Sequence, residues 1–540
     1  ASAELCGFAK TDILAPGASE TVNITVDKSE LRTYDANNAK TYIVDAGDYY
    51  FTAATDAHNA VNNILAAKGY TVENTDGRMT ADGNVALTYK WTNAALDSTT
   101  YATSETGTAI TNLFDEADPN KSSSEPGEVT WLSRSNWVAT FPTQPVVLNA
   151  TQTLADHLAF TRYNGSKADS VEMPTLGADN GLALVSMIGA DYDDPQWDTL
   201  LDQLTFNEMV NTITLGFHNT AAIESIGKTR TKDENGPQGL TAALTGGASA
   251  MCYTSEDVMA ATFNVDLIND VGRCIGEDCL AMGYSGLYGP GINMHRTAYS
   301  GRNFEYYASD PFIAGTICAA EVNGIQSKGV YVYLKHVALN DSESSRRGVN
   351  TWLNEQAARE IYLEVADKAI TDGGAWSVMT GFNRWGAYWC GAYDNLLTGF
   401  LRGELGLRGM IITDYSGSSK YMDLADGLIA GSDIWDSPDP TIHTTLAPKY
   451  ENDAYIVTEM RESMHKILYT VANSNAMNGW SSADRLKVIT PWWKTALYAL
   501  DTVLAVLTVL CIWRLVVAIK RKKTWTAEQA ANTASAQNQQ

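Results

Sequence analysis

Between about residues 195 and 475, short apolar runs alternate with longer amphipathic stretches. Four runs predict strands: SGLYGPGIN (285–293), GVYVYLKHVAL (329–339), WSVMTGFN (376–383) and GMIITDYS (409–416). The stretch 354–374 between the second and third runs predicts a helix, with Gly373 as its C-cap. A repeated strand–helix order of this length predicts a (β/α)8 TIM-like barrel or a doubly wound sheet. No G-x-G-x-x-G follows a strand, which disfavours a dinucleotide-binding sheet.

The N-terminal third has a different pattern. Residues 1–57 contain short alternating runs, ETVNITV (20–26), KTYIVDAG (40–47) and DYYFTAAT (48–55), separated by Gly, Asp and Asn. This alternation predicts a small antiparallel β-sandwich that is truncated, because 57 residues are few for such a fold. Residues 58–194 mix a helical run, HNAVNNILAAKGY, with polar stretches such as KSSSEPGE. They predict a linker or wrapping arm between the sandwich and the barrel at 195–475.

The C-terminal part predicts one transmembrane helix over 492–519. The segment is long and apolar enough to cross a bilayer, and two tryptophans stand at its start. Four basic residues, from Lys520 to Lys523, follow at once and predict a cytoplasmic C-terminus. Residues 476–491 would then be juxtamembrane and 520–540 a cytoplasmic tail, with the barrel outside the cell. A buried or interfacial helix is the alternative interpretation.

Composition narrows the class of partner. The chain has 540 residues with 38 Lys plus Arg and 63 Asp plus Glu, a net charge of −25, which disfavours nucleic acid. Its seven cysteines are scattered and indicate neither a disulfide framework nor a metal site, and no cofactor motif is present. The first residues, ASAELCGFAKTD, lack the features of a signal peptide. We therefore expect this chain to be the C-terminal portion of a longer product.

Several predicted strands end in ionisable residues. VYVYLKHVALND delivers Lys335 and His336, GMIITDYSG delivers Asp414, and YGPGINMHRTAYSGRNFE leads to Arg302 and Glu305. In a barrel the carboxyl ends of the strands meet on one face, so these groups would share a pocket. An Asp at a strand end can also cap a helix, and a Lys–His pair can be a buried ion pair, so each signal alone is weak.

Such a pocket suits a sugar. Lys, Arg, His and carboxylates supply the dense hydrogen bonding that hydroxyl groups require. Tyr415, Trp385 and Trp389 lie near these residues in sequence and could stack on the apolar face of a pyranose. They could equally pack at the rim of the fold.

At these residues the sequence resembles glycoside hydrolase family 3. GRNFEYYASDP, KHVALNDSESSRRG, SVMTGFNRWG and LRGMIITDYSG are similar to successive barrel motifs of that family, in order, within about residues 200–475. CGFAKTDILAPGASETVNITV through AGDYYF resembles the fibronectin type III-like domain of many members. That domain precedes the barrel here, which resembles the subgroup with inverted domain order.

The resemblance implies a retaining β-glycosidase with Asp414 as the nucleophile. It implies contact with the sugar for Asn235, Arg302, Lys335, His336, Met379, Phe382 and Tyr415. It also implies that Glu343 and Arg346 support Lys335 from behind. It implies no metal and no cofactor.

The sequence departs from the family pattern in three respects. Asn235 stands before Gly-Pro where the family usually has Asp, and Tyr415 follows the nucleophile where many members have Trp. The family's acid/base Glu usually comes from an α/β-sandwich domain, which would be a missing N-terminal partner of this chain. No acid/base residue is therefore identified here.

The expected function is hydrolysis of terminal β-glycosyl residues at the cell surface, with β-glucosides as the favoured substrates. A β-xylosidase or arabinosidase is the nearest alternative. A membrane-anchored sugar-binding protein without full catalysis, or an adhesion ectodomain, is the alternative from another class.

Overall fold

The computed structural model describes residues 3–123, 128–133, 136–145, 147, 149–159, 161–417, 420–439, 449–487 and 489–538. The chain divides into two compact units, residues 1–485 and 486–540. The first unit contains every strand of the described residues, and the second consists mainly of one long helix. Each unit is described by itself below.

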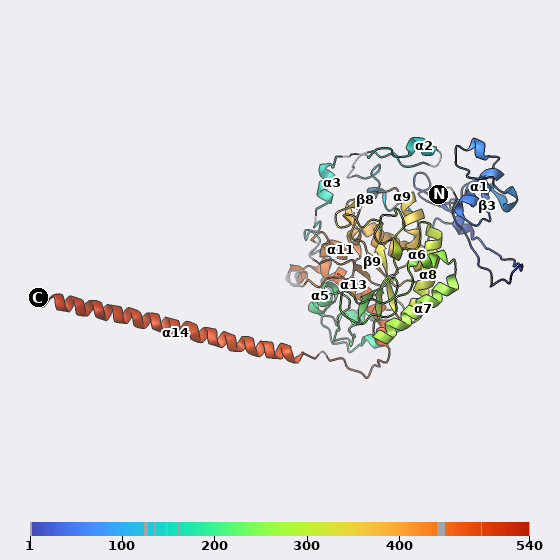
Figure 1. Ribbon diagram of the computed structural model, residues 1–540. Coiled ribbons are helices and arrows are strands. Elements are labelled where there is room, and N and C mark those ends of the chain that lie inside the picture. Colours follow the sequence, from blue (N-terminus) through green and yellow to red (C-terminus); the bar gives the residue numbers. More distant parts are fainter. Residues whose placement is uncertain are drawn as a thin grey trace. The chain divides into compact units, whose positions relative to one another are not determined.

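A five-stranded parallel sheet lies at the centre of the first unit (Figure 1). Its strand order is β12 (Ile411–Thr413), β9 (Ser377–Thr380), β7 (Tyr331–Val337), β6 (Gly286–Tyr288) and β5 (Asp233–Asn235). Each of the four predicted apolar runs contains one of these strands, so those predictions are confirmed. The fifth strand, β5, was not predicted, because it is three polar or charged residues long and has no apolar pattern.

Helices follow the strands along the chain, as parallel pairing requires. The helices of this part are α4 (Gln196–Leu201), α5 (Phe206–Thr214), α6 (Glu256–Ala261), α7 (Val265–Met282), α8 (Pro311–Gln326), α9 (Glu355–Ala357), α10 (Glu364–Thr371), α11 (Leu424–Ala430) and α13 (Ala454–Ala472). Short strands β8 (Asn350–Thr351), β10 (Arg384–Trp385) and β11 (Tyr388–Trp389) form a small separate sheet.

The helix predicted over 354–374 is present but interrupted. A π-helical turn, Ala358–Tyr362, separates α9 from α10. Helix α10 ends at Thr371 with Asp372 as its C-cap, so the predicted C-cap at Gly373 is one position too late. The left-handed glycine that follows is Gly374, with φ of 67°. Gly373 has a different reason to be glycine, since a Cβ there would lie 2.7 Å from the Ala369 carbonyl oxygen.

Main-chain hydrogen bonds link the two edges of the sheet. Beyond β12, Ile434 pairs in parallel with Ile412, and the Trp435 N–H donates to the Ile213 carbonyl at 2.8 Å. On the other side, the Asp233 N–H donates to the His218 carbonyl at 3.0 Å. The described residues thus show a five-stranded parallel sheet whose edges are joined through the end of α5, the loop 215–218 and the segment 433–436. The predicted eight-stranded (β/α)8 barrel is not shown as such.

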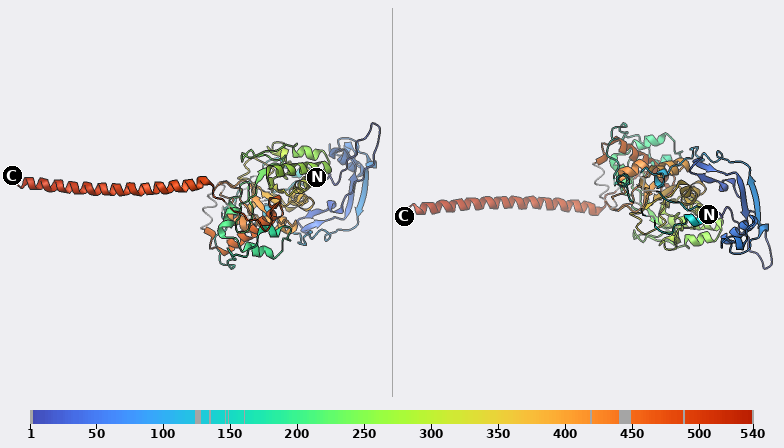
Figure 2. Two further views of the ribbon diagram at one scale, coloured as in Figure 1. Left: turned by 90° about the horizontal axis from the view of Figure 1, so that it is seen from below. Right: turned by 90° about the horizontal axis from the view of Figure 1, so that it is seen from above.

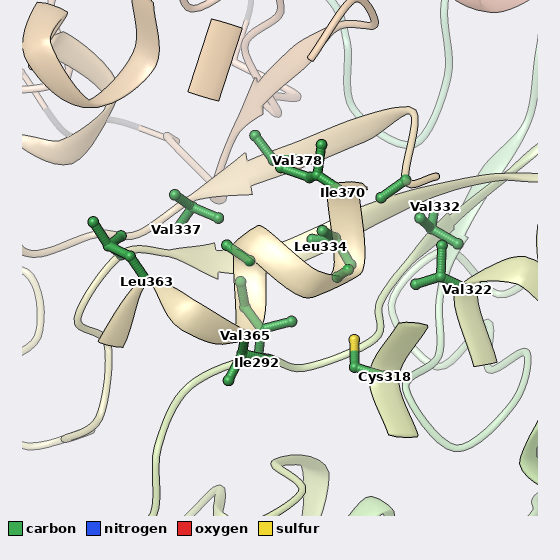
Figure 3. Close-up of a cluster of buried hydrophobic side chains, with 14 of the residues drawn as sticks. Ile292, Cys318, Val322, Val332, Leu334, Val337, Leu363, Val365, Ile370 and Val378 are labelled. Atoms are coloured by element: carbon green, nitrogen blue, oxygen red, sulfur yellow. The ribbon is translucent and has the colours of Figure 1, made fainter. Parts of the chain in front are cut away.

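Both faces of the sheet are buried, as is usual for parallel sheets. Outward-facing Leu334 and Val378 belong to one hydrophobic cluster with Val365 and Ile370 of α10 (Figure 3). The inward-facing side chains form a second cluster, to which the strands contribute Tyr288, Tyr331, Tyr333, Met379, Met410, Ile412 and Ile434. Because side chains alternate along a strand, Lys335 and Asp414 follow Tyr333 and Ile412 on the inward face.

The N-terminal region forms two small antiparallel sheets among the described residues. β1 (Thr33–Asp35) pairs with β2 (Thr41–Ile43), and β3 (Gly47–Thr52) pairs with β4 (Thr88–Asn93) over six residue pairs (Figure 2). The β3–β4 ladder joins residues that lie on the two sides of residue 57 in the chain. The run 20–26 carries no strand, which corrects that prediction: Val22 and Ile24 are exposed, and alternation without a pairing partner makes no ladder.

Residues 58–194 pack along the first unit, with helices α1 (Ala57–Ala67), α2 (Trp137–Thr140) and α3 (Gln152–His157). A buried arginine, Arg359, anchors this segment. Its guanidinium pairs with Glu355 and Glu404, each at 2.7 Å, and donates to the Thr111 carbonyl at 2.9 Å. Glu355 in turn accepts hydrogen bonds from the main chain at Phe114. The arm is therefore tied to the sheet-and-helix unit through one buried charge network.

The second unit contains α14 (Trp492–Gln537), a helix of 46 residues. By length and composition it is able to cross a membrane, and none of its most apolar stretch is buried against other described residues. The helix begins where the transmembrane segment was predicted. It continues past Ile519 through most of the predicted tail.

We predict that Arg359→Ala strongly destabilises the first unit. The substitution leaves the carboxylates of Glu355 and Glu404 buried without their partner, which costs on the order of 3–5 kcal/mol. Chemical unfolding of the detergent-solubilised protein measures the change. The exposed pair of Arg273 and Asp270 supplies the control, because Arg273→Ala should change stability by less than about 1 kcal/mol. Equal effects of the two substitutions would contradict the anchoring role.

Candidate active site

Asp414 stands directly after β12 at the carboxyl end of the sheet. It is buried, and its N–H donates to the Thr380 carbonyl at 3.2 Å, which continues the pairing with β9. Carboxylate oxygen Oδ1 accepts a hydrogen bond from the Tyr415 N–H at 2.7 Å. Oxygen Oδ2 lies 3.4 Å from His336 Nε2 and accepts no hydrogen bond from the described residues. One oxygen is thus held by the backbone and the other is left for chemistry.

Lys335 and His336, at the end of β7, lie beside this carboxylate. Lys335 Nζ is 3.7 Å from Glu305 Oε2. His336 Nε2 is 3.2 Å from Arg302 Nη1. Four of the predicted site residues, Asp414, His336, Arg302 and Lys335, therefore belong to one contiguous group, although three of them come from segments more than thirty residues apart.

A carboxylate network holds the cations of this group in place. Arg302 Nε donates to Glu305, and Arg302 Nη1 is 3.6 Å from Glu343 Oε1. Glu343 also pairs with Arg346 at 3.1 Å and accepts a hydrogen bond from Asn340 Nδ2 at 3.2 Å. Glu343 and Arg346 therefore lie behind Arg302, whereas the sequence led us to expect them behind Lys335, whose described ion pair is with Glu305.

Burial and charge set the protonation of these groups. Burial raises the pKa of Asp414, and the nearby cations Arg346, Arg302 and Lys335 oppose that rise. Burial and the charges of Arg302 and Lys335 hold the pKa of His336 well below its usual value, so its imidazole is neutral. Burial likewise lowers the pKa of Lys335. The site combines a carboxylate, a neutral imidazole and two paired cations.

The remaining predicted contacts lie around this group. Met379 on β9 is in register with Lys335 on β7. Phe382 is buried beneath the guanidinium of Arg346, whose Cζ is 4.5 Å from the ring centroid. Tyr415 is 39% exposed, so its ring is open to a ligand.

Two of the proposed stacking aromatics are misplaced. Trp385 and Trp389 are fully buried. The Trp385 ring stacks on Phe114 at 4.2 Å between centroids, and Trp389 Nε1 donates to the Gly381 carbonyl at 3.0 Å. Both tryptophans belong to the core, and only Tyr415 among the three can face a sugar.

Asn235 ends β5 and belongs to a second polar group. Its N–H and Nδ2 donate to Glu234 Oε1 at 3.0 and 3.2 Å. The same oxygen lies 3.0 Å from His218 Nδ1. Burial lowers the pKa of His218, but its hydrogen bond to Glu234 and the charges of Glu234 and Asp436 outweigh that effect and raise it overall. His218 and Glu234 therefore form a buried ion pair next to Asn235.

Asp436 is a site residue that the sequence patterns missed. It follows the short segment Ile434–Trp435, is buried, and lies 3.4 Å from the Tyr288 hydroxyl through Oδ1. Two apolar residues between two aspartates are too few to predict a strand, so the pattern gave no signal. The run still ends in a carboxylate, as the run before Asp414 does, and that shared feature could have drawn attention to it.

We predict that Asp436 makes stability depend on pH. Burial, together with the charge of Asp414 and against that of His218, raises the pKa of Asp436 to about 7. An unfolded Asp titrates near pH 3.9, so unfolding releases a proton between about pH 4 and 7, and wild-type stability falls as pH rises through that window. Asp436→Asn has no carboxyl to titrate at this position. Its free energy of unfolding relative to that of the wild type should therefore increase as pH rises through the window, by at most about 4 kcal/mol.

Chemical unfolding at pH 4 and at pH 8 measures the difference between the two proteins. Asp270→Asn, at an exposed position, is the control and should track the wild type at both values. A variant-to-wild-type difference that stays constant with pH would contradict the assignment.

Two parts of the chain match known domain families. Residues 217–442 match the glycosyl hydrolase family 3 N-terminal domain, and residues 1–57 match the fibronectin type III-like domain. The chain is 33% identical over 251 residues to β-glucosidase B of Emericella nidulans, covering 46% of this chain and 29% of that protein. It is 27% identical over 445 residues to β-glucosidase A of Butyrivibrio fibrisolvens, covering 80% of this chain and 49% of that protein.

The fold is similar to that of a β-glucosidase from Paenibacillus barengoltzii. The TM-score is 0.65 with 20% sequence identity, and the match covers 90% of this chain and 51% of that chain. The chain thus spans about half or less of the length of these relatives.

Proposed function

We propose that the protein hydrolyses terminal β-glycosidic bonds, with small β-glucosides as its main substrates, because residues 217–442 match the glycosyl hydrolase family 3 N-terminal domain. The similarity to β-glucosidases from Emericella nidulans and Butyrivibrio fibrisolvens supports the substrate class. The observation that carries the proposal is the buried Asp414 carboxylate, with one oxygen held by the backbone and the other beside His336. That arrangement suits a nucleophile.

The proposed reaction proceeds with retention in two displacements. Asp414 Oδ2 attacks the anomeric carbon, the bond from that carbon to the leaving-group oxygen breaks, and a covalent glycosyl-aspartate forms. Water then attacks the same carbon, the ester bond breaks, and Asp414 is regenerated as the carboxylate while the water's second proton goes to solvent or to a base. Tyr415 N–H holds Oδ1 throughout and so orients Oδ2.

The side chains around Asp414 would bind the sugar. Arg302 and Lys335 are donors only, and neutral His336 offers either a donor or an acceptor, which together match hydroxyl groups. The side-chain nitrogen Nδ2 of Asn235 donates to Glu234, so the side-chain oxygen Oδ1 is the atom available to a sugar hydroxyl. Tyr415 would stack on the sugar ring, since its ring is the exposed one.

The other predicted contacts have supporting places in this proposal. Met379 and Phe382 would form an apolar wall. Glu343 would hold Arg302 in position, and Arg346 would hold Glu343. No residue is assigned as the general acid, so glycosides with good leaving groups, which need little protonation, are the appropriate test substrates.

We expect Asp414→Asn to abolish formation of the covalent intermediate. The wild type should accumulate a glycosyl adduct on Asp414 with a 2-deoxy-2-fluoro-β-glucosyl donor, because the fluorine slows its hydrolysis. The variant, having no nucleophile, should form none and should lose at least about 10³-fold in rate on dinitrophenyl β-glucoside.

Peptide mass spectrometry locates the adduct, and Asp270→Asn is the control, which should react as the wild type does. An adduct on another residue would refute the assignment of the nucleophile. Binding of glucose without turnover or adduct in the wild type would favour the sugar-binding alternative, and faster turnover of β-xylosides or α-arabinosides would favour that second specificity.

We also propose that α14 anchors the protein in a cell membrane with the first unit outside and the C-terminus in the cytoplasm. The exposed apolar surface of α14 and the basic residues from Lys520 to Lys523 support this orientation. The central sheet would form the wall of a TIM-like barrel, and the hydrogen bonds that join its edges support closure.

Removal of residues 486–540 should release the protein from membranes. The full chain should sediment with membranes after a carbonate wash, whereas residues 1–485, a compact unit, should remain in the supernatant. In intact cells a protease should digest the first unit and spare a C-terminal epitope tag. Recovery of the full chain in the supernatant would contradict the anchor, and external loss of the tag would contradict the orientation.

A further inference from the structure

Asp436, a buried residue that shares the Tyr288 hydroxyl with the His218 N–H, has a carboxyl to which the proposed function gives no role. We infer that Asp436 is a substrate-binding residue, whose carboxyl binds one hydroxyl of the sugar and so determines which glycosides are accepted. This inference rests on the proposed glycosidase function and deepens it.

Strand register places Asp436 beside Asp414. Ile412 and Ile434 are partners in a parallel pairing, and each aspartate stands two residues further along its own strand. Residues two apart on a strand lie on the same face of the sheet, and neighbouring strands are about 4.8 Å apart. Both carboxyls therefore lie at the same end of adjacent strands and on the same face. Two hydrogen bonds fix this register beyond the pairing: the Ser416 N–H donates to the Asp436 carbonyl at 2.9 Å, and the Asp436 N–H donates to Thr413 Oγ1 at 3.1 Å.

The inward face is the one that carries the proposed sugar contacts. Ile412 is in register with Met379, and Met379 is in register with Lys335. The same row therefore runs from Lys335 through β9 and β12 to Ile434. Asp414 and Asp436 stand one step above that row, at the open end of the strands. Asp436 thus belongs to the layer that holds the proposed nucleophile.

The side chains around Asp436 orient its carboxyl but leave it available to bind a ligand. The Tyr288 hydroxyl is 3.4 Å from Oδ1 and fixes the orientation of the carboxyl. The nearby cation, His218, already has a partner in Glu234 at 3.0 Å. No Lys or Arg of the described part of the chain forms an ion pair with Asp436, in contrast to Asp433, which pairs with Arg402 at 2.7 Å and with Lys466 at 3.6 Å. Asp433 is a structural carboxylate, and Asp436 is not paired in that way.

Asp436 also supplies what Asn235 lacks. A carboxyl binds a sugar hydroxyl more strongly than an amide does, because hydrogen bonds to charged groups are roughly twice as strong as neutral ones. At neutral pH the Asp436 carboxyl exchanges between its charged and protonated forms, since burial raises its pKa to about 7. It can accept a hydrogen bond in the first form and donate one in the second.

The test is a thermodynamic cycle that combines substitution of Asp436 with removal of one sugar hydroxyl. Dinitrophenyl β-glucoside and its analogues lacking one hydroxyl at C3, C4 or C6 are hydrolysed by the full-length wild type, Asp436→Ala and Asp436→Asn. If Asp436 binds one of these hydroxyls, removing that hydroxyl should lower kcat/KM of the wild type by about 10–100-fold and that of Asp436→Ala by less than about threefold. The other two analogues should lose equally in both proteins.

Three results separate the possible failures. Equal losses in wild type and Asp436→Ala for all three analogues would overturn the inference and leave the glycosidase intact. The same result in the near-isosteric Asp436→Asn would exclude a folding defect as its cause. A wild type that neither turns over the parent glucoside nor forms the covalent adduct would overturn the proposed function and this inference together. Asp270→Ala is the control and should show the wild-type pattern of losses.

Discussion

A charged side chain can be buried only where opposite charges or hydrogen bonds replace the water it loses, and this constraint shapes the candidate site. Lys335 and Arg302 are both largely buried, and each contacts Glu305. Glu305 itself is held ionised, because the two cations outweigh the effect of burial on its pKa. Because Lys335 and Arg302 are already paired with Glu305, they can contact a neutral ligand without forming an ion pair with Asp414.

The site residues that could be predicted are those on, or directly after, strands that appear as apolar runs in the sequence. The strand that contains Lys335 is seven buried residues long and the one before Asp414 begins with two isoleucines, so both produce a clear pattern. Arg302, which lies in a loop, was named from the polar stretch that follows a predicted strand, and the motif resemblance then supported it. Geometry brought these residues together as expected, while their chemical roles remain predictions.

The rest could not be read from the sequence for physical reasons. The strand β5 and the segment around Asp436 are short, and their partners are distant in sequence, so pairing rather than composition defines them. Alternation alone also misled: the run 20–26 has the pattern of a strand but no neighbour to pair with among the described residues. Trp385 and Trp389 show the same limit, because nearness in sequence to Asp414 did not reveal that they point into the core.

The network around Arg359 has a consequence for how the protein could have evolved. Its guanidinium lies 4.6 Å from the ring of Tyr34 and 5.7 Å from that of Phe114, so residues far apart in the chain share one buried charge. A recombination event that exchanged the N-terminal region for that of another protein would have to bring matching aromatic partners with it. The N-terminal region and the helix that carries Arg359 would therefore have to be inherited together, so the region is not an interchangeable module.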